Sequence, residues 1–211
     1  MSTIVPADQN PFASRYLDSL PYQFLDTQIS LESLLTRWQQ MGHRAAIVGP
    51  CGHGKSTLLD NLQILLHGKG YTTTRIKLSR GEWRLSQDHH DQILNAIQNQ
   101  RILLLDGVEQ LPWPYWTWLK TFGWPSSFQL LIASHVKGRL PTLIETKTSP
   151  ALLGCLIERL FPSSDMTDSE IAVLFNKHHG DIRMALLELY DRVSTGKLKT
   201  LLPIHNGETI D

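Results

Sequence analysis

The sequence predicts an α/β fold in which a parallel sheet is sandwiched by helices and followed by a small helical lid. Up to residue 148, short apolar runs that are typical of buried parallel strands alternate with segments whose apolar residues recur at helical spacing. After residue 148 only helical patterns follow. Alternating strands and helices indicate a parallel sheet covered on both faces, and the change of pattern indicates a second packing unit.

We therefore divide the chain into four parts. Residues 1–28 contain three prolines and predict an extended N-terminal arm. Residues 29–148 form the α/β core, residues 149–196 the helical lid, and residues 197–211 a C-terminal tail.

The elements of the core follow from local signals. Ser30 can cap a first helix, which Gly42 terminates. The apolar run 45–48 predicts a strand that leads through a glycine-rich turn into a helix over 56–67. The remaining core elements are a β-rich strand at 71–78, a helix at 86–100, strand 101–106, a proline-punctuated helix within 111–123, strand 128–134 and a short strand at 142–146.

Three helices are predicted in the lid. Ser149 caps the first, and Pro150 opens it. Thr167 and Glu170 have the spacing of a capping box and start the second, which ends near Gly180. Asp181 caps the third.

Composition narrows the class of protein. Twenty basic and twenty acidic residues give a formal net charge of zero, so the charge does not support nucleic acid as the main partner, although a local basic patch could still bind it. Two cysteines without paired spacing indicate a reducing compartment. Neither a signal peptide nor a membrane helix is predicted, and we expect a soluble cytoplasmic protein.

The segment "GPCGHGKST" matches the pattern G-x-x-x-x-G-K-[ST] between a predicted strand and a predicted helix, which is the context that a phosphate-binding loop requires. Lys55 would reach the outer phosphates of a nucleotide, and the Ser56 hydroxyl would bind Mg²⁺. Asp106 ends another apolar strand and is the predicted second magnesium ligand. The predicted nucleotide-binding residues of the loop are Gly49, Pro50, Cys51, Gly52, His53, Gly54, Lys55, Ser56 and Thr57.

With these motifs the sequence resembles P-loop NTPases, and among them AAA+ ATPases of the replication-initiation and transposition-helper type. The segment "GDIRMALLELYD" at 180–191 resembles the lid motif of that group. The resemblance implies that Arg183 touches the nucleotide phosphates and that Ser134, or His135 beside it, senses the outer phosphate. The strand end "DG-x-EQL" also resembles that of a small, poorly characterised bacterial ATPase family.

The residue after Asp106 departs from this resemblance. Such enzymes often place a second carboxylate there to orient the attacking water, but this chain has Gly107, and the nearest acidic residue is Glu109. If the chain turns directly into a helix, Asp106 and Glu109 share a face and Glu109 can act on the water. If it stays extended they face opposite ways, and Glu109 could instead stabilise the start of the next helix.

Several residues allow two interpretations. Cys51 and His53 are tolerated loop residues, unless oxidation of the thiol blocks the nucleotide. Trp113, Trp116, Trp118 and Trp124 are clustered, and those at 113, 116 and 124 predict a helical core face, with a partner-binding surface as the alternative. Arg183 could be a solvated helix residue. Arg139 and Arg159 are candidates for an arginine that a neighbouring subunit supplies.

We predict an ATPase in which Lys55, Asp106 and Glu109 are catalytic and ATP and Mg²⁺ are the cofactors. Its partner would be an unidentified protein or a second copy of the chain. One alternative is a nucleotide-binding switch or scaffold that hydrolyses slowly. A small-molecule kinase is a weaker alternative, because residues 149–194 lack the arginine-rich insertions of such enzymes.

Overall fold

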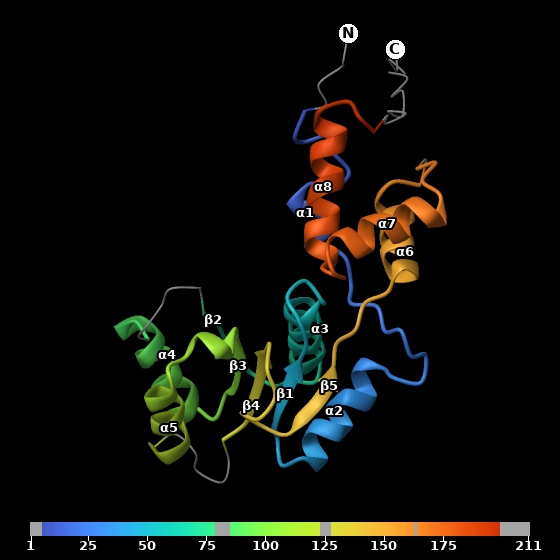
Figure 1. Ribbon diagram of the computed structural model, residues 1–211. Coiled ribbons are helices and arrows are strands. Elements are labelled where there is room, and N and C mark those ends of the chain that lie inside the picture. The colour runs from blue at the N-terminus through green and yellow to red at the C-terminus, as the bar shows by residue number, and fades with distance from the viewer. Residues whose placement is uncertain (1–5, 79–84, 123–127, 163, 199–211) are drawn as a thin grey trace, which may run out of the picture. The chain divides into compact units, whose positions relative to one another are not determined.

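The computed structural model describes residues 6–78, 85–122, 128–162 and 164–198, which fall into two compact units. The core unit is residues 20–148. The helical unit combines the chain before residue 20 with the chain from residue 149 onward. Figure 1 shows the elements of both units.

The core unit contains a five-stranded sheet whose strands are all parallel, in the order β2-β3-β4-β1-β5. This arrangement confirms the predicted α/β class. Because β4 lies between β1 and β3, the carboxyl ends of these three strands are adjacent at one edge of the sheet. The strands are β1 (Arg44–Val48), β2 (Thr73–Lys77), β3 (Ile102–Asp106), β4 (Leu130–Ser134) and β5 (Thr142–Glu145).

Helices cover both faces of the sheet (Figure 1). Side chains of a strand point alternately to opposite faces. In β3, Leu103 and Leu105 pack with the α4 and α5 side, whereas Ile102 and Leu104 pack with the α2 and α3 side. The same alternation places Asp106 on the side of α3. The helices are α2 (Leu31–Gln40), α3 (Lys55–Gly68), α4 (Gln87–Gln98) and α5 (Trp113–Phe122).

The tryptophan prediction is correct for Trp116 and wrong for Trp113. Trp116 is fully buried, but Trp113 is 64% exposed. The buried stripe of α5 passes through Trp116 and Leu119, and Trp113, as the first residue of the helix, lies at the edge of that stripe. Trp118 is partly buried against the core, and Trp124 lies outside the described residues.

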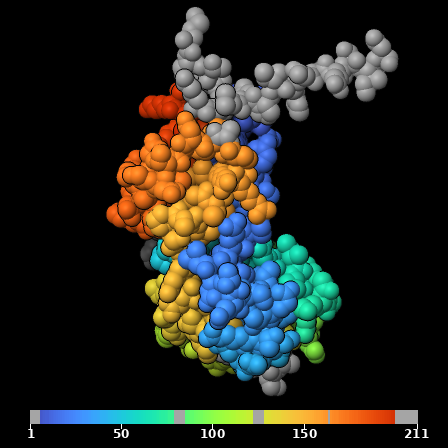
Figure 2. Space-filling model, turned by 90° about the vertical axis from the view of Figure 1, so that its right-hand side faces the viewer, coloured from blue at the N-terminus to red at the C-terminus, as the bar shows by residue number. Residues whose placement is uncertain are grey.

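The segment before α2 also packs on the core unit. The Tyr22 N–H donates a hydrogen bond to Asn61 Oδ1 of α3 at 2.8 Å, and the Tyr22 and Phe24 rings meet edge to face. Figure 2 shows the region around residues 20–40, in blue, on the surface of this unit.

The helical unit packs α6 (Pro150–Leu160), α7 (Asp168–Lys177) and α8 (Ile182–Ser194) around one apolar cluster. The capping residues that the sequence predicts each accept a hydrogen bond from the first turn of their helix: Ser149 from Leu152, Thr167 from Glu170 and Asp181 from Met184. Among the described residues, no helix is long and apolar enough to cross a membrane.

Part of the predicted N-terminal arm belongs to the helical unit instead. Phe12 is buried in its apolar cluster, with its ring edge to face with Phe161 at 6.3 Å. Asn10 is also buried, and its Nδ2 donates to the Tyr190 carbonyl at 2.9 Å. A short helix, α1 (Ser14–Leu17), follows. Prolines restrict the backbone locally, but they do not prevent such long-range burial.

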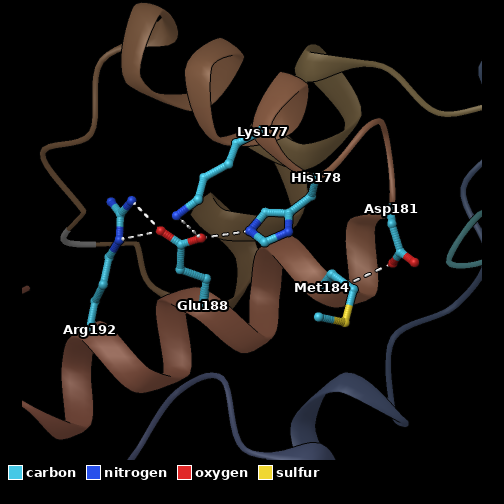
Figure 3. A network of polar contacts seen from close by, with 6 residues as sticks. All are labelled: Lys177, His178, Asp181, Met184, Glu188 and Arg192. Carbon is cyan, nitrogen blue, oxygen red and sulfur yellow. Dashed lines mark hydrogen bonds and ion pairs between the residues drawn. The ribbon is translucent and has the colours of Figure 1, made fainter.

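A polar network joins α7 to α8 (Figure 3). Glu188 Oε2 lies 2.7 Å from Lys177 Nζ and 2.6 Å from His178 Nε2, and Glu188 Oε1 lies 2.6 Å from Arg192 Nη2. The hydrogen bond from Lys177, with those from Arg192 and His178, outweighs desolvation and lowers the pKa of Glu188 to about 2.

Candidate nucleotide-binding site

The loop from Gly49 to Gly54 joins β1 to α3, and its glycines are required by geometry. Gly52 and Gly54 have φ values of 68° and 77°, in the left-handed region that favours glycine. A Cβ on Gly54 would also lie 3.0 Å from the Tyr22 ring. At Gly49 a Cβ would lie 2.2 Å from Thr146 Oγ1 and 2.9 Å from the Thr146 carbonyl oxygen. The sequence therefore specifies a loop that curls tightly between strand and helix.

Helix α3 begins without a side-chain cap. Its N-cap is Gly54, which has no side chain that could accept a hydrogen bond from the first turn. By contrast, α2, α4, α6, α7 and α8 each have a capping hydroxyl or carboxylate, from Ser30, Ser86, Ser149, Thr167 and Asp181. The first N–H groups of a helix have no partner within the helix, and together with the helix dipole they favour an anion. The loop of residues 49–54 therefore ends at a helix start whose geometry suits an anion.

Lys55 is the first residue of α3 and is only 8% exposed. Its side chain folds back over the loop, and Nζ donates to the Pro50 carbonyl oxygen at 2.7 Å. An ammonium group has three N–H donors, so it can hold the loop and also contact a phosphate oxygen. Ser56, the next residue, is exposed.

Asp106 ends β3 and is 5% exposed. Arg75 Nη2 donates to one of its two oxygens, Oδ2, at 3.0 Å. Mg²⁺ prefers oxygen ligands and is usually held by one or two protein groups together with phosphate and water. The Asp106 carboxylate and the Ser56 hydroxyl have this chemistry, so they fit the ion. Within the described part of the chain, no group of three or more His, Cys, Asp or Glu side chains could hold a metal.

After Asp106 the chain turns directly into a helical segment. Gly107 adopts φ 80°, and η1 (Val108–Gln110) is a 3₁₀ helix. A Cβ at Gly107 would lie 2.8 Å from the Leu78 carbonyl oxygen, so the position suits glycine in both conformation and space. Of the two backbone paths that the sequence left open, the structure has the helical one.

The Glu109 side chain, 17% exposed, is directed toward the end of β4. Oε2 accepts a hydrogen bond from the His135 backbone N–H at 3.2 Å, and Oε1 lies 3.4 Å from His135 Nε2. Glu109 thus contacts the residue that directly follows β4, the strand between β1 and β3.

Ser134 is fully buried and its hydroxyl is already engaged. Its Oγ donates to the Val136 carbonyl at 2.9 Å and accepts from the Val136 N–H at 3.2 Å. A hydroxyl has one hydrogen to donate, so this geometry argues against direct contact between Ser134 Oγ and a phosphate. The Ser134 carbonyl accepts from Gly49 N–H at 3.2 Å, which fixes the start of the phosphate loop. The alternative, His135, is 33% exposed at its side chain.

The other predicted residues are distributed as follows. Cys51 is an exposed free cysteine, and His53 Nε2 lies 3.5 Å from Thr148 Oγ1. Arg183 is exposed in the first turn of α8, in the helical unit. Arg159 is exposed on α6 of the same unit.

Arg139 is a poor candidate for an arginine that reaches a neighbouring subunit. It donates to the Leu111 carbonyl at 2.8 Å and stacks over the indole rings of Trp113 and Trp116 at 5.7 and 5.2 Å. These contacts hold the guanidinium within its own unit.

Sequence reasoning missed Tyr22, which packs on the phosphate loop, and Arg75, which binds Asp106. A signal for Arg75 is present, because it is a cation within the β-rich run "TTRIK". Its partner is not encoded locally, since Asp106 lies 31 positions away and comes close only through the pairing of β2 with β3.

Comparison with known proteins supports the fold. No family model matches the sequence, and no curated protein matches it. Among solved structures, the chain is similar to Hsp104 in its closed state with ATPγS and FITC casein, at a TM-score of 0.50 and 11% identity, over 89% of this chain and 40% of that one. It is also similar to a STAND ATPase with a tetratricopeptide repeat sensor from Pyrococcus horikoshii, at a TM-score of 0.44 and 14% identity, over 82% of this chain and 31% of that one.

The chain spans less than half the length of either of these proteins. The five-stranded parallel sheet, flanked by helices, and the likeness to Hsp104 show an α/β fold like that of this neighbour.

Proposed function

We propose that this protein binds ATP with Mg²⁺ at residues 49–57 and hydrolyses it as an AAA+-like ATPase, coupling the nucleotide state to the helical lid or to a partner. The observation that carries the proposal is the glycine-opened, uncapped start of α3, with Lys55 folded over the loop that precedes it. That start follows β1, a buried strand of the parallel sheet, through the glycine-rich loop, and this setting suits phosphate.

Each residue has a role that its position supports. The N–H groups of the loop and Lys55 bind phosphate oxygens, and Ser56 and Asp106 hold Mg²⁺, which neutralises charge on the outer phosphates. Glu109 orients the hydrolytic water by accepting a hydrogen bond from it. His135 positions Glu109 through the two contacts between them.

Thermal melting of the wild type and of Lys55→Ala tests nucleotide binding. ATP with Mg²⁺ should raise the Tm of the wild type, since a ligand at 100 times its Kd adds ~2.7 kcal/mol to the free energy of unfolding. Lys55→Ala should lose this shift. Lys69→Ala is a matched control because Lys69 is an exposed lysine at the other end of the same helix. A wild type whose Tm does not respond to millimolar ATP or GTP with Mg²⁺ would contradict the proposal.

The second candidate function is a nucleotide-dependent switch or scaffold with little hydrolysis. It is favoured by Gly107, which stands where the resemblance leads us to expect a second carboxylate. ATP turnover, measured alone and with candidate macromolecules, separates the two functions. If self-association stimulates turnover, Arg159 is the candidate for the arginine that a neighbouring copy supplies, because it is exposed.

A further inference from the structure

Arg75 of β2 lies between two carboxylates. Its Nη2 donates to Asp106 Oδ2 at 3.0 Å, and its Nη1 is 2.6 Å from Asp60 Oδ1 of α3 in an ion pair. The side chains of Arg75 and Asp106 are 18% and 7% exposed, so water screens this pair weakly, whereas Asp60 is 56% exposed. One guanidinium therefore neutralises the carboxylate at the end of β3.

The same contacts join the two elements that would hold the metal. Asp60 and Ser56 are four residues apart on α3 and share a helix face. Arg75 thus connects the face of α3 that carries Ser56 to the end of β3 that carries Asp106. A positive charge at this junction opposes a cation that approaches Asp106.

We propose that Arg75 makes Mg²⁺ binding at Asp106 conditional on the nucleotide. This inference rests on the proposed function. Without nucleotide, Arg75 satisfies the Asp106 carboxylate, and the site has too little negative charge for a divalent cation. The phosphates of ATP supply the missing charge, so the metal binds together with the nucleotide and not before it. Arg75 is therefore a positioning residue that acts through Asp106.

The sign of the effect follows from the charges. Replacing Arg75 by a neutral residue leaves Asp60 and Asp106 on either side of position 75 with no cation between them. Two neighbouring carboxylates favour a divalent cation. Losing the hydrogen bond also loosens Asp106, which opposes metal binding, but removing a unit charge a few ångströms from the metal has the larger effect in a site that water screens weakly.

Binding of Mn²⁺, as a probe for Mg²⁺, to the nucleotide-free full chain tests the proposal, with free Mn²⁺ measured by electron paramagnetic resonance. We expect Arg75→Gln to bind Mn²⁺ at least ~10-fold more tightly than the wild type. Arg75→Lys, which keeps the charge, should bind as weakly as the wild type. Adding Asp106→Asn to Arg75→Gln should abolish the gain, which assigns the bound metal to Asp106.

Circular dichroism checks that each variant is folded, and Arg75→Met, which keeps the apolar stem, provides a second neutral variant. The proposal is overturned if the folded neutral variants bind Mn²⁺ no more tightly than the wild type, as expected of a purely structural ion pair. These measurements need no nucleotide. Failure of the proposed function would instead appear as a wild type whose Tm does not respond to ATP with Mg²⁺.

Discussion

The Glu109 carboxylate and His135 make two contacts across the end of β4, a hydrogen bond of 3.2 Å from the His135 backbone N–H and a 3.4 Å approach of His135 Nε2. The backbone contact does not depend on the protonation of the imidazole. It holds Glu109 at the edge of the sheet where β3 ends in Asp106. A single turn after Gly107 thus brings a carboxylate to this edge, although it lies three positions after Asp106.

From this contact we predict that Glu109→Gln lowers ATP turnover by roughly 10²- to 10⁴-fold, the range expected when a general base is removed. ATP affinity should remain within a few-fold, because the amide has nearly the same shape and its oxygen can still accept from His135 N–H. Single-turnover hydrolysis and the ATP-dependent Tm shift measure the two quantities.

Glu145→Gln is the matched control, since Glu145 is an exposed glutamate at the end of β5, paired with Lys137. It should change turnover less than about twofold, as expected for a surface pair. If Glu109→Gln also leaves turnover within a few-fold of the wild type, Glu109 serves only to fix the end of β4.

The centre of the sheet could be predicted from sequence because β1, β3 and β4 are short and almost entirely buried apolar strands. Leu103, Leu104 and Leu105 are all fully buried, so the run needs no alternation to be recognised. The helix starts could be predicted because capping is local: Ser30 and Thr167 contact residues three positions downstream. The phosphate loop is equally local, since its glycines lie within six residues.

The contacts that sequence reasoning missed join residues far apart in the chain. Asn10 meets Tyr190 across 180 positions, and no pattern within residues 1–28 specifies that packing. The position of Ser134 at the end of β4 favours a sensing role, but its hydroxyl makes hydrogen bonds with the Val136 backbone in the turn that follows β4. Such competition between side chain and local backbone depends on the conformation of the turn, which the residue type does not specify.

From the Glu188 network we predict how the free energy of unfolding depends on pH in the acid range. Lys177, Arg192 and His178 lower the pKa of Glu188 to about 2, below the value of about 4.5 in the unfolded chain. A depressed carboxylate pKa contributes stability that is present above pH ~4.5 and lost as the pH falls toward 2. We expect Glu188→Gln to lower the free energy of unfolding at pH 7 by ~1 kcal/mol, a modest value because Lys177 and Arg192 are partly exposed.

Thermal or urea unfolding of both proteins from pH 7 to pH 2 measures this effect. The difference between wild type and variant should be constant above pH 5 and shrink between pH ~4.5 and 2. Glu158→Gln, at an exposed position on α6, should show little difference at any pH. A Glu188 difference that does not change with pH would mean that packing, and not the charge of Glu188, stabilises the end of α7.

The final prediction concerns Arg183 and the proposed lid. Asp181 caps α8 through the Met184 N–H at 2.9 Å, so Arg183 lies in the first turn of the helix. A cation at the positive end of a helix dipole is mildly unfavourable, which suggests that an anion binds near Arg183 when the protein functions. If that anion is the bound nucleotide, ATP should protect residues 149–194 from limited proteolysis in the wild type but not in Arg183→Ala. The Tm without nucleotide should be unchanged, because Arg183 is exposed.

Arg159→Ala is the control: it removes another exposed arginine of the helical unit and should keep the protection. Equal protection in Arg183→Ala and in the wild type would show that the nucleotide acts on the helical unit through other residues, or not at all.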